Sequence, residues 1–240
     1  MSMSDGWADY ASELQERIAR DGVDSFMDWS VTNKTMVRGF SADVMIEKQH
    51  VMAGFLQVRE SDLPTGTSVQ QYHALLMARN FGIELGAIRH VVEFGAGIGE
   101  MVYAAKKVMP NLISHTIFDI EPVCTIQRYR FERDSMQHAK TFSVMSDFTK
   151  HVSTTTSGAN PKEILFISIC VISEAPVQTR DSLLRTPLGA SLMQNSILRV
   201  QPVWDMVDNL AYFIGLAKVG EAIKVSPCVF SGHVYMVRAL

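Results

Sequence analysis

The spacing of hydrophobic residues changes near residue 85. Before that point apolar side chains such as Leu14 and Ile18 recur every three to four positions, which is the period of an amphipathic helix. The same period covers residues 44–55, and a third helix is predicted from about Ser68 to a stop at Gly82. After residue 90 the apolar residues gather in short runs separated by helical patterns, which is typical of strand-helix-strand units.

These short runs predict a largely parallel sheet. The expected parallel strands cover residues 90–94, 114–120, 141–145, 163–172 and 210–216, and a closing antiparallel hairpin covers 222–230 and 233–239. Residues 176–208 carry helical patterning. We therefore expect an α/β fold: a Rossmann-like, seven-stranded, mostly parallel sheet with an antiparallel C-terminal hairpin and a helical N-terminal extension. The predicted division is a helical cap and acceptor region over 1–85 and a sheet domain over 86–240.

Composition fits a soluble globular protein and selects no partner. The chain has 240 residues, 47% apolar and 20% charged, and its net charge of −3 gives no overall attraction to nucleic acid or to an anionic membrane. Cys124, Cys170 and Cys228 are too far apart for a metal clip, so buried free thiols are expected. The first residues lack the pattern of a secretory leader, which predicts a cytoplasmic protein, and a homo-oligomer is left open.

A glycine-rich turn joins the first predicted strand to its helix. Residues 93–100 read Glu-Phe-Gly-Ala-Gly-Ile-Gly-Glu, so Gly95, Gly97 and Gly99 let the chain turn sharply and let a ligand approach the backbone. Dinucleotides and S-adenosylmethionine both bind at such turns. The dinucleotide pattern needs a small residue where Glu100 stands, and carboxylates at Glu93 and Glu100 would repel a diphosphate. The same acidity suits a ligand that carries a sulfonium and an ammonium group.

Acidic residues also follow the second and third predicted strands. Asp119, with Ile120 beside it, stands where a carboxylate accepts hydrogen bonds from ribose hydroxyls. Asp147 and Phe148 follow the third strand, where an acidic side chain can accept from the adenine amino group and an apolar one can pack on the ring. Tyr72 is a candidate for bonding the carboxylate of the methionine part, with a core aromatic as the alternative. Together these residues predict a nucleoside-binding edge.

From about Tyr72 to its C-terminus the chain resembles the class I S-adenosylmethionine-dependent methyltransferases. The glycine motif of residues 93–99 and the closing hairpin carry this resemblance. Residues 118–122 (Phe-Asp-Ile-Glu-Pro), 127–129 (Gln-Arg-Tyr) and 172–176 (Ile-Ser-Glu-Ala-Pro) are similar to segments of the sugar O-methyltransferase family. The resemblance implies S-adenosyl-L-methionine as cofactor, with Glu93 ordering its methionine part. It also implies methyl transfer to a hydroxyl of a sugar or of a sugar-containing small molecule.

The resemblance places the catalytic residues after the fourth predicted strand, whose end faces the methyl group in this family. Glu174 is the first candidate, as the base or as the residue that orients the acceptor, and His233 is the second. Each has a structural alternative, because Ser173 or Glu174 can cap the next helix and His233 can be a solvated turn histidine. Asp208 and Asn209 resemble the acidic pair of metal-dependent O-methyltransferases but precede the fifth predicted strand, so no metal ligands are assigned.

Three other functions stay open. The glycine turn does not distinguish an enzyme from a non-catalytic S-adenosylmethionine-binding protein with a regulatory or assembly role. A methyltransferase acting on another acceptor class is equally compatible with it. A nicotinamide-dependent oxidoreductase is the third alternative, and Glu100 disfavours it.

Overall fold

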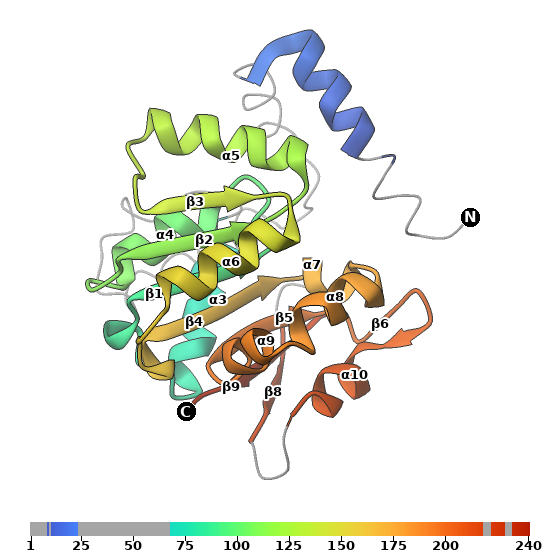
Figure 1. The fold of residues 1–240 in the computed structure, drawn as a ribbon. Helices are drawn as coiled ribbons and strands as arrows, with labels where there is room; N and C mark the ends of the chain where they lie inside the picture. The colour runs from blue at the N-terminus through green and yellow to red at the C-terminus, as the bar shows by residue number, and fades with distance from the viewer. Residues whose placement is uncertain (1–8, 10, 24–67, 218–221, 229–231) are drawn as a thin grey trace, which may run out of the picture.

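The chain folds around a central sheet that is covered by helices on both faces (Figure 1). The computed structural model describes residues 9, 11–23, 68–217, 222–228 and 232–240. The helix predicted over residues 44–55 lies outside the described residues. Within the described ranges, no helix is both long enough and apolar enough to cross a lipid bilayer.

The sheet has seven strands in the order β3-β2-β1-β4-β5-β9-β8. They are β1 (His90–Phe94), β2 (Ser114–Phe118), β3 (Ala139–Phe142), β4 (Ile164–Ile169), β5 (Ser196–Val200), β8 (Lys224–Pro227) and β9 (Val234–Arg238). Strands β1 to β5 are parallel, and β9 is antiparallel to both of its neighbours. This arrangement confirms the predicted fold class. A separate antiparallel pair is formed by β6 (Val203–Trp204) and β7 (Val207–Asp208).

Alternate residues of each strand enter two different core layers. Val91 and Leu165 belong to the layer that includes buried residues of α3 and α4, and Val92 and Phe166 belong to the opposite layer with residues of α6, α8, α9 and α10. All residues of β1 are buried because helices cover both faces of the sheet.

The helices follow the strands in the order expected of a parallel sheet. They are α3 (Ser68–Asn80), α4 (Glu100–Val108), α5 (Glu121–Arg133), α6 (Met145–Thr155), α7 (Val171–Glu174), α8 (Val177–Leu184), α9 (Pro187–Leu192) and α10 (Asn209–Gly215), with the single turns η2 (Leu85–Ala87) and η3 (Pro161–Glu163). Because β1 to β4 run in the same direction, the turns that follow them meet at one edge, called here the carboxyl edge.

The fifth predicted strand is wrong. Residues 210–216 form most of α10 and the residue after it, whereas the fifth parallel strand, β5, lies inside the stretch that was expected to be helical. The Asp208 side chain accepts a hydrogen bond from the N–H of Ala211 at 2.9 Å and so caps α10. Every residue of β5 is buried, and such a short run lacks the alternation that would separate a strand from a buried helix.

Helices from the predicted N-terminal region pack against the sheet domain. Leu75 and Ala78 of α3 lie in the same core layer as α4, so the sheet domain begins before residue 86. A helix over residues 11–23, blue in Figure 1, buries Leu14 in a cluster with Ile98 and Ile126 beside the glycine turn. The N-terminal region therefore contributes both to the core and to the surroundings of the carboxyl edge.

Candidate functional site

The glycine turn lies at the carboxyl edge between β1 and α4. Gly95, Gly97 and Gly99 have φ values of 77°, 54° and 81°, a region that glycine adopts without strain. A Cβ at Gly95 would lie 2.2 Å from the Cβ of Val171, and one at Gly99 would lie 2.5 Å from the ring of Phe131. A Cβ at Gly97 would meet no described atom within 4 Å. Two of the glycines are therefore needed for packing, and Gly97 borders open space.

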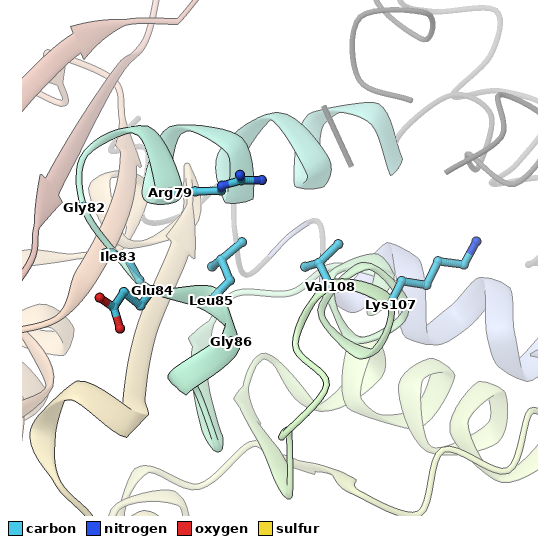
Figure 2. Close-up of a pocket in the computed structure, with 8 residues that line it drawn as sticks. All are labelled: Arg79, Gly82, Ile83, Glu84, Leu85, Gly86, Lys107 and Val108. Atoms are coloured by element: carbon cyan, nitrogen blue, oxygen red, sulfur yellow. The ribbon is translucent and has the colours of Figure 1, made fainter. Parts of the chain in front are cut away.

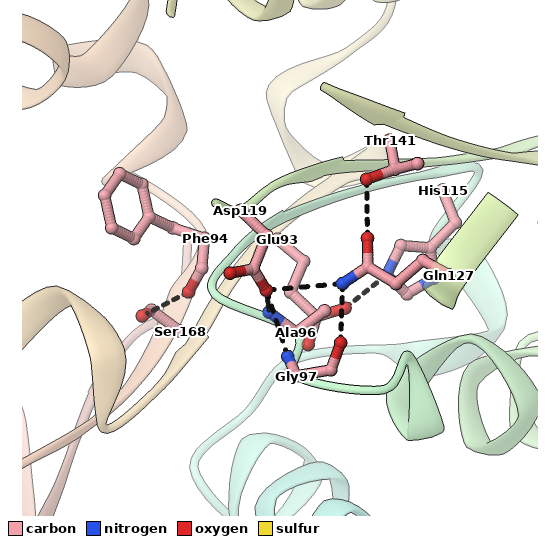
Figure 3. A network of polar contacts seen from close by, with 9 residues as sticks. All are labelled: Glu93, Phe94, Ala96, Gly97, His115, Asp119, Gln127, Thr141 and Ser168. Carbon is pink, nitrogen blue, oxygen red and sulfur yellow. Dashed lines mark hydrogen bonds and ion pairs between the residues drawn. The ribbon is translucent and has the colours of Figure 1, made fainter. Parts of the chain in front are cut away.

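Asp119 is held against this turn (Figure 3). Its Oδ2 accepts hydrogen bonds from the backbone N–H of Ala96 at 2.9 Å and of Gly97 at 3.1 Å, and from Nε2 of Gln127 at 3.2 Å. Its Oδ1 accepts from the N–H of Ile120 at 2.9 Å and keeps a second lone pair to which a ribose hydroxyl can donate. The backbone thus orients the carboxylate before any ligand binds.

Gln127 was missed as a site residue. It is fully buried on α5, its Nε2 donates to the carbonyl of Gly97 at 2.7 Å, and its Oε1 accepts from the hydroxyl of Thr141 at 2.5 Å. It therefore joins α5 and β3 to the glycine turn. The available signal was a glutamine on the buried face of a helix, a polar residue that needs buried partners.

The ionisation of Asp119 is perturbed by its surroundings. Burial raises its pKa to about 7, although the three backbone N–H donors act in the opposite direction. Ribose hydroxyls donate hydrogen bonds and are bound best by the ionised carboxylate. Binding of a ribose at this position is therefore expected to strengthen as the pH rises through neutrality.

The two glutamates of the turn are both paired. Nε2 of His115 lies 2.8 Å from Oε2 of Glu93 within the core, and Nη1 of Arg130 lies 3.0 Å from Oε1 of Glu100. Repulsion of a diphosphate is therefore weaker than the sequence suggests, because each charge has a partner. Glu93 is only 2% exposed and bonds to β2, which leaves its predicted contact with the methionine part without structural support.

The residues predicted for adenine have different surroundings. Asp147 is exposed in the first turn of α6. Phe148 is fully buried, and its ring packs against Phe118 with centroids 5.5 Å apart. A fully buried ring has no face left for adenine, so the predicted stacking by Phe148 does not fit its position. Ile98 of the glycine turn and Ile120, the neighbour of Asp119, belong to one apolar cluster.

Tyr72 brings a buried hydroxyl from α3. The residue is 1% exposed, and its Oη has no hydrogen-bond partner among the described residues. Burial raises its pKa to about 12, and the charge of Glu100 at the start of α4 adds to the rise. An unpartnered buried hydroxyl lowers stability, and a ligand that accepts its hydrogen bond removes that penalty. Tyr72 is thus both a core aromatic and a candidate ligand contact.

The turn after β4 is the short helix α7, fixed by a buried arginine. Arg180 donates from Nη2 to the carbonyl of Ser173 at 2.5 Å and from Nε to the carbonyl of Ala175 at 2.6 Å. The hydroxyl of Ser173 donates to the carbonyl of Cys170 at 2.6 Å. No side chain caps the following helix, α8, so the capping alternative for Ser173 and Glu174 is excluded. Ser173 instead holds α7 together.

Glu174 and His233 are brought together at this turn. One ligand atom each of Glu174, His233 and Cys170 lie within 4.8 Å of one another, although His233 is far in sequence from the other two, which flank α7. Burial raises the pKa of Glu174, and the positive charge of Arg199 partly opposes the rise. A raised pKa makes the ionised carboxylate a stronger base. Glu174 is therefore better matched than an ordinary glutamate to accept the proton of an acceptor hydroxyl.

The Asp208–Asn209 pair is structural. Asp208 caps α10, and the buried Asn209 accepts from Nη1 of Arg180 at 2.5 Å and donates to the carbonyl of Gln201 at 2.7 Å. The side-chain hydrogen bonds of both residues are thus made within the protein.

A cavity of about 600 Å³ lies away from these residues (Figure 2). It is lined by Arg79, Gly82, Ile83, Glu84, Leu85, Gly86, Lys107 and Val108. These residues come from the end of α3, from η2 and from the end of α4, at the edge of the sheet where β1 begins. The cavity is therefore separate from the glycine turn.

Comparisons with known proteins give structural similarity only. No protein-family model and no curated protein matches the chain. It is similar to the SAH-bound Podospora anserina methyltransferase PaMTH1, with 12% identity over 89% of this chain and 94% of that chain and a TM-score of 0.45. It is also similar to an O-methyltransferase from Bacillus cereus in complex with SAH, with 12% identity, coverage of 86% and 96%, and a TM-score of 0.48. An rRNA methylase from Escherichia coli gives 14% identity, coverage of 94% and 88%, and a TM-score of 0.41. At such low similarity, function has to be inferred from the residues themselves.

Proposed function

We propose that the chain binds S-adenosyl-L-methionine at the glycine turn and transfers its methyl group to a hydroxyl of a small molecule. The carboxylate of Asp119 carries this proposal, since the amides of Ala96 and Gly97 hold it at the end of β2 with a lone pair of Oδ1 available. Open space beside Gly97 lets a nucleoside approach that carboxylate.

The order of the strands favours this cofactor over a dinucleotide. The doubly wound dinucleotide fold continues as a parallel sheet in the order 3-2-1-4-5-6. Here β9 and β8 occupy the end of the sheet as an antiparallel hairpin, as the resemblance to class I methyltransferases implies. Glu100 also opens α4 with a carboxylate where a dinucleotide needs a small residue.

When bound, S-adenosylmethionine supplies an electrophilic methyl group on a sulfonium. In this proposal Asp119 accepts hydrogen bonds from the ribose, and the buried hydroxyl of Tyr72 donates to the carboxylate of the methionine part. Glu174 accepts the proton of the acceptor hydroxyl, and His233 helps to orient that hydroxyl. The remaining catalytic contribution is alignment of the acceptor with the methyl group, away from water.

A sugar or a sugar-containing small molecule is the proposed acceptor class. The support is the similarity of residues 118–122, 127–129 and 172–176 to the sugar O-methyltransferase family. Within these segments, Asp119, Gln127 and Glu174 lie at the carboxyl edge. Residues 172–176 matter most for the acceptor, because they contain the candidate base.

Calorimetric titration tests the cofactor. Wild-type protein is expected to bind S-adenosylmethionine and S-adenosylhomocysteine but not reduced nicotinamide dinucleotide. Asp119→Ala should weaken cofactor binding by about tenfold or more, because charge-assisted hydrogen bonds are lost. Glu132→Ala removes an exposed carboxylate of α5 and serves as the matched control, with unchanged affinity expected.

Release of S-adenosylhomocysteine tests the reaction. The protein is incubated with S-adenosylmethionine and a panel of sugars, nucleotide sugars and non-sugar hydroxyl compounds. Turnover confined to the sugar compounds supports the proposed acceptor class, and turnover with the others alone contradicts it. Tight cofactor binding without turnover on any acceptor supports the non-catalytic alternative, and equal affinity for the nicotinamide compound contradicts the cofactor assignment.

A further inference from the structure

Among the described residues, a three-residue group combines the side chains that bind transition metals. Cys170 follows β4 directly and precedes α7, Glu174 ends α7, and His233 precedes β9. One ligand atom from each, a sulfur, a carboxylate oxygen and an imidazole nitrogen, lie within 4.8 Å of one another. We propose that this group is a three-ligand site for a divalent transition metal ion, with zinc as the best match.

The donor set decides which metal fits. Thiolate and imidazole ligands suit zinc, whereas magnesium and calcium are bound mainly by oxygen. In a tetrahedral zinc site neighbouring ligand atoms are separated by about 3.3–3.8 Å, as follows from metal–ligand distances of about 2.0–2.3 Å. The three atoms, which lie within 4.8 Å of one another, therefore need to approach by at most about 1.5 Å to close around one ion. A site with three protein ligands keeps a fourth position for water or substrate.

The backbone around Cys170 is built rigidly. Cys170 has a φ of 74°, which is rare for a residue other than glycine and is maintained only when the surrounding structure enforces it. Its N–H donates to the carbonyl of Arg199 at 2.8 Å, and its carbonyl accepts from the hydroxyl of Ser173. Arg180 anchors the other end of α7 through the carbonyls of Ser173 and Ala175. Two of the three ligands are therefore positioned by groups that are themselves buried and bonded.

His233 is positioned by the terminal hairpin. Its carbonyl accepts from the N–H of Cys228 at 2.9 Å, which links β8 and β9 just before the antiparallel pairing with β5 begins. The positive charge of Arg199 also lies near Glu174 and partly opposes the binding of a cation there.

The site also suggests a role in the reaction, and this part rests on the proposed function. With the ion bound, Glu174 acts as a ligand and no longer as the base, and an acceptor hydroxyl in the fourth position loses its proton to solvent more easily. Its lone pair then forms a bond to the methyl carbon, and the sulfonium sulfur keeps the electron pair of the broken carbon–sulfur bond. The ion would therefore orient the acceptor next to the glycine turn, which touches α7 through Gly95 and Val171.

Cobalt titration tests metal binding without any cofactor. The full chain is freed of metal with a chelator and titrated with Co²⁺ under reducing conditions. The expected result is one ion per chain with a thiolate-to-cobalt absorption band in the near ultraviolet. Cys170→Ser should abolish the band, whereas Glu174→Gln and His233→Ala should weaken binding by about tenfold or more. Cys228→Ala and His151→Ala are the matched controls and should retain it.

Two results overturn the metal site. One is the absence of a thiolate band in the wild type, and the other is a band that survives in Cys170→Ser but disappears in Cys228→Ala. Alkylation of the wild-type protein avoids any problem with variant folding. Cys170 is partly accessible, whereas Cys124 and Cys228 are buried. Zn²⁺ should slow the alkylation of Cys170 by about tenfold, and an unchanged rate contradicts the proposal. Cofactor binding measured separately shows whether the proposed function fails independently.

Discussion

The two halves of the carboxyl edge are built differently. In the cofactor half, formed by the glycine turn, Asp119, Gln127 and Thr141, the polar groups bond to one another and to the backbone. In the acceptor half, formed by Cys170, Glu174 and His233, side chains from the two ends of α7 and from the residue before β9 converge near one point. The side chains of the first half are thus held by hydrogen bonds without a ligand, whereas those of the second half are brought close to one another. Substitutions in the cofactor half should therefore change cofactor affinity, whereas substitutions in the acceptor half should change kcat.

The largest expected effect tests this separation in the acceptor half. Glu174→Gln keeps the shape of the side chain but removes the base, so kcat should fall by about 10²–10⁴-fold. Affinity for S-adenosylmethionine should not change, because Glu174 lies outside the cofactor half. Steady-state kinetics and calorimetry measure the two quantities, with Glu132→Gln as the control. An equal loss in both quantities would show that the halves are not independent.

Two glycine substitutions compare packing with ligand access in the cofactor half. Gly95→Ala places a Cβ against the side chain of Val171 and forces an alanine into a positive φ. The free energy of unfolding should therefore fall by about 2–4 kcal/mol. Gly97→Ala meets open space and should lose only about 1 kcal/mol while weakening cofactor binding. Urea denaturation and calorimetry distinguish them. Equal destabilisation by both would contradict the open space at Gly97.

The pH dependence of stability reports on Asp119. Its folded pKa of about 7 lies above the ordinary value of 3.8, so between these pH values the folded state holds a proton that the unfolded chain has lost. Stability from this group is therefore present at low pH and is lost as the pH rises to about 7. Asp119→Asn does not ionise, so its stability relative to the wild type should rise by roughly 4 kcal/mol across that window. Parallel pH-dependent denaturation curves for the two proteins would refute this assignment.

The smallest expected effect concerns Tyr72. Tyr72→Phe removes an unpartnered buried hydroxyl, so the cofactor-free protein should keep its stability or gain up to about 1 kcal/mol. Its affinity for S-adenosylmethionine should fall by about three- to tenfold. Tyr103→Phe is the matched control, because the hydroxyl of Tyr103 donates to Asp134 at 2.6 Å and its loss should destabilise the protein. A clear loss of stability in Tyr72→Phe would show that its hydroxyl is bonded after all.

Local patterns predicted the backbone around the glycine turn well, whereas the binding roles of its residues remain predictions. Strand β1 has the predicted bounds, and the glycine turn and Asp119 lie where parallel-strand logic places them. Those signals lie in short segments whose conformation depends on residues nearby in the sequence. Phe148 was misassigned because sequence position after a strand does not reveal whether a ring faces the edge or the core.

Non-local contacts set the limits of prediction. The prediction placed a strand at residues 210–216, which are mostly helical, and helical patterning over β5. Short apolar runs do not distinguish strands from buried helices. The pairing of Glu93 with His115 depends on the register of β1 and β2. Because of this pairing, Glu93 repels a diphosphate less strongly than its position in the sequence suggests. Cys170 was judged a buried thiol because nothing in the sequence shows that the terminal hairpin brings His233 beside it.

The position of β9 in the sheet has a consequence for how this protein can diversify. The last strand inserts between β5 and β8, so the end of the chain contributes His233 to the acceptor half but no residue to the Asp119 network. Under the proposed function, mutations in the hairpin are expected to change acceptor choice and to leave the hydrogen bonds of Asp119 intact. Libraries restricted to residues 222–240 offer a practical route to new acceptors on this scaffold.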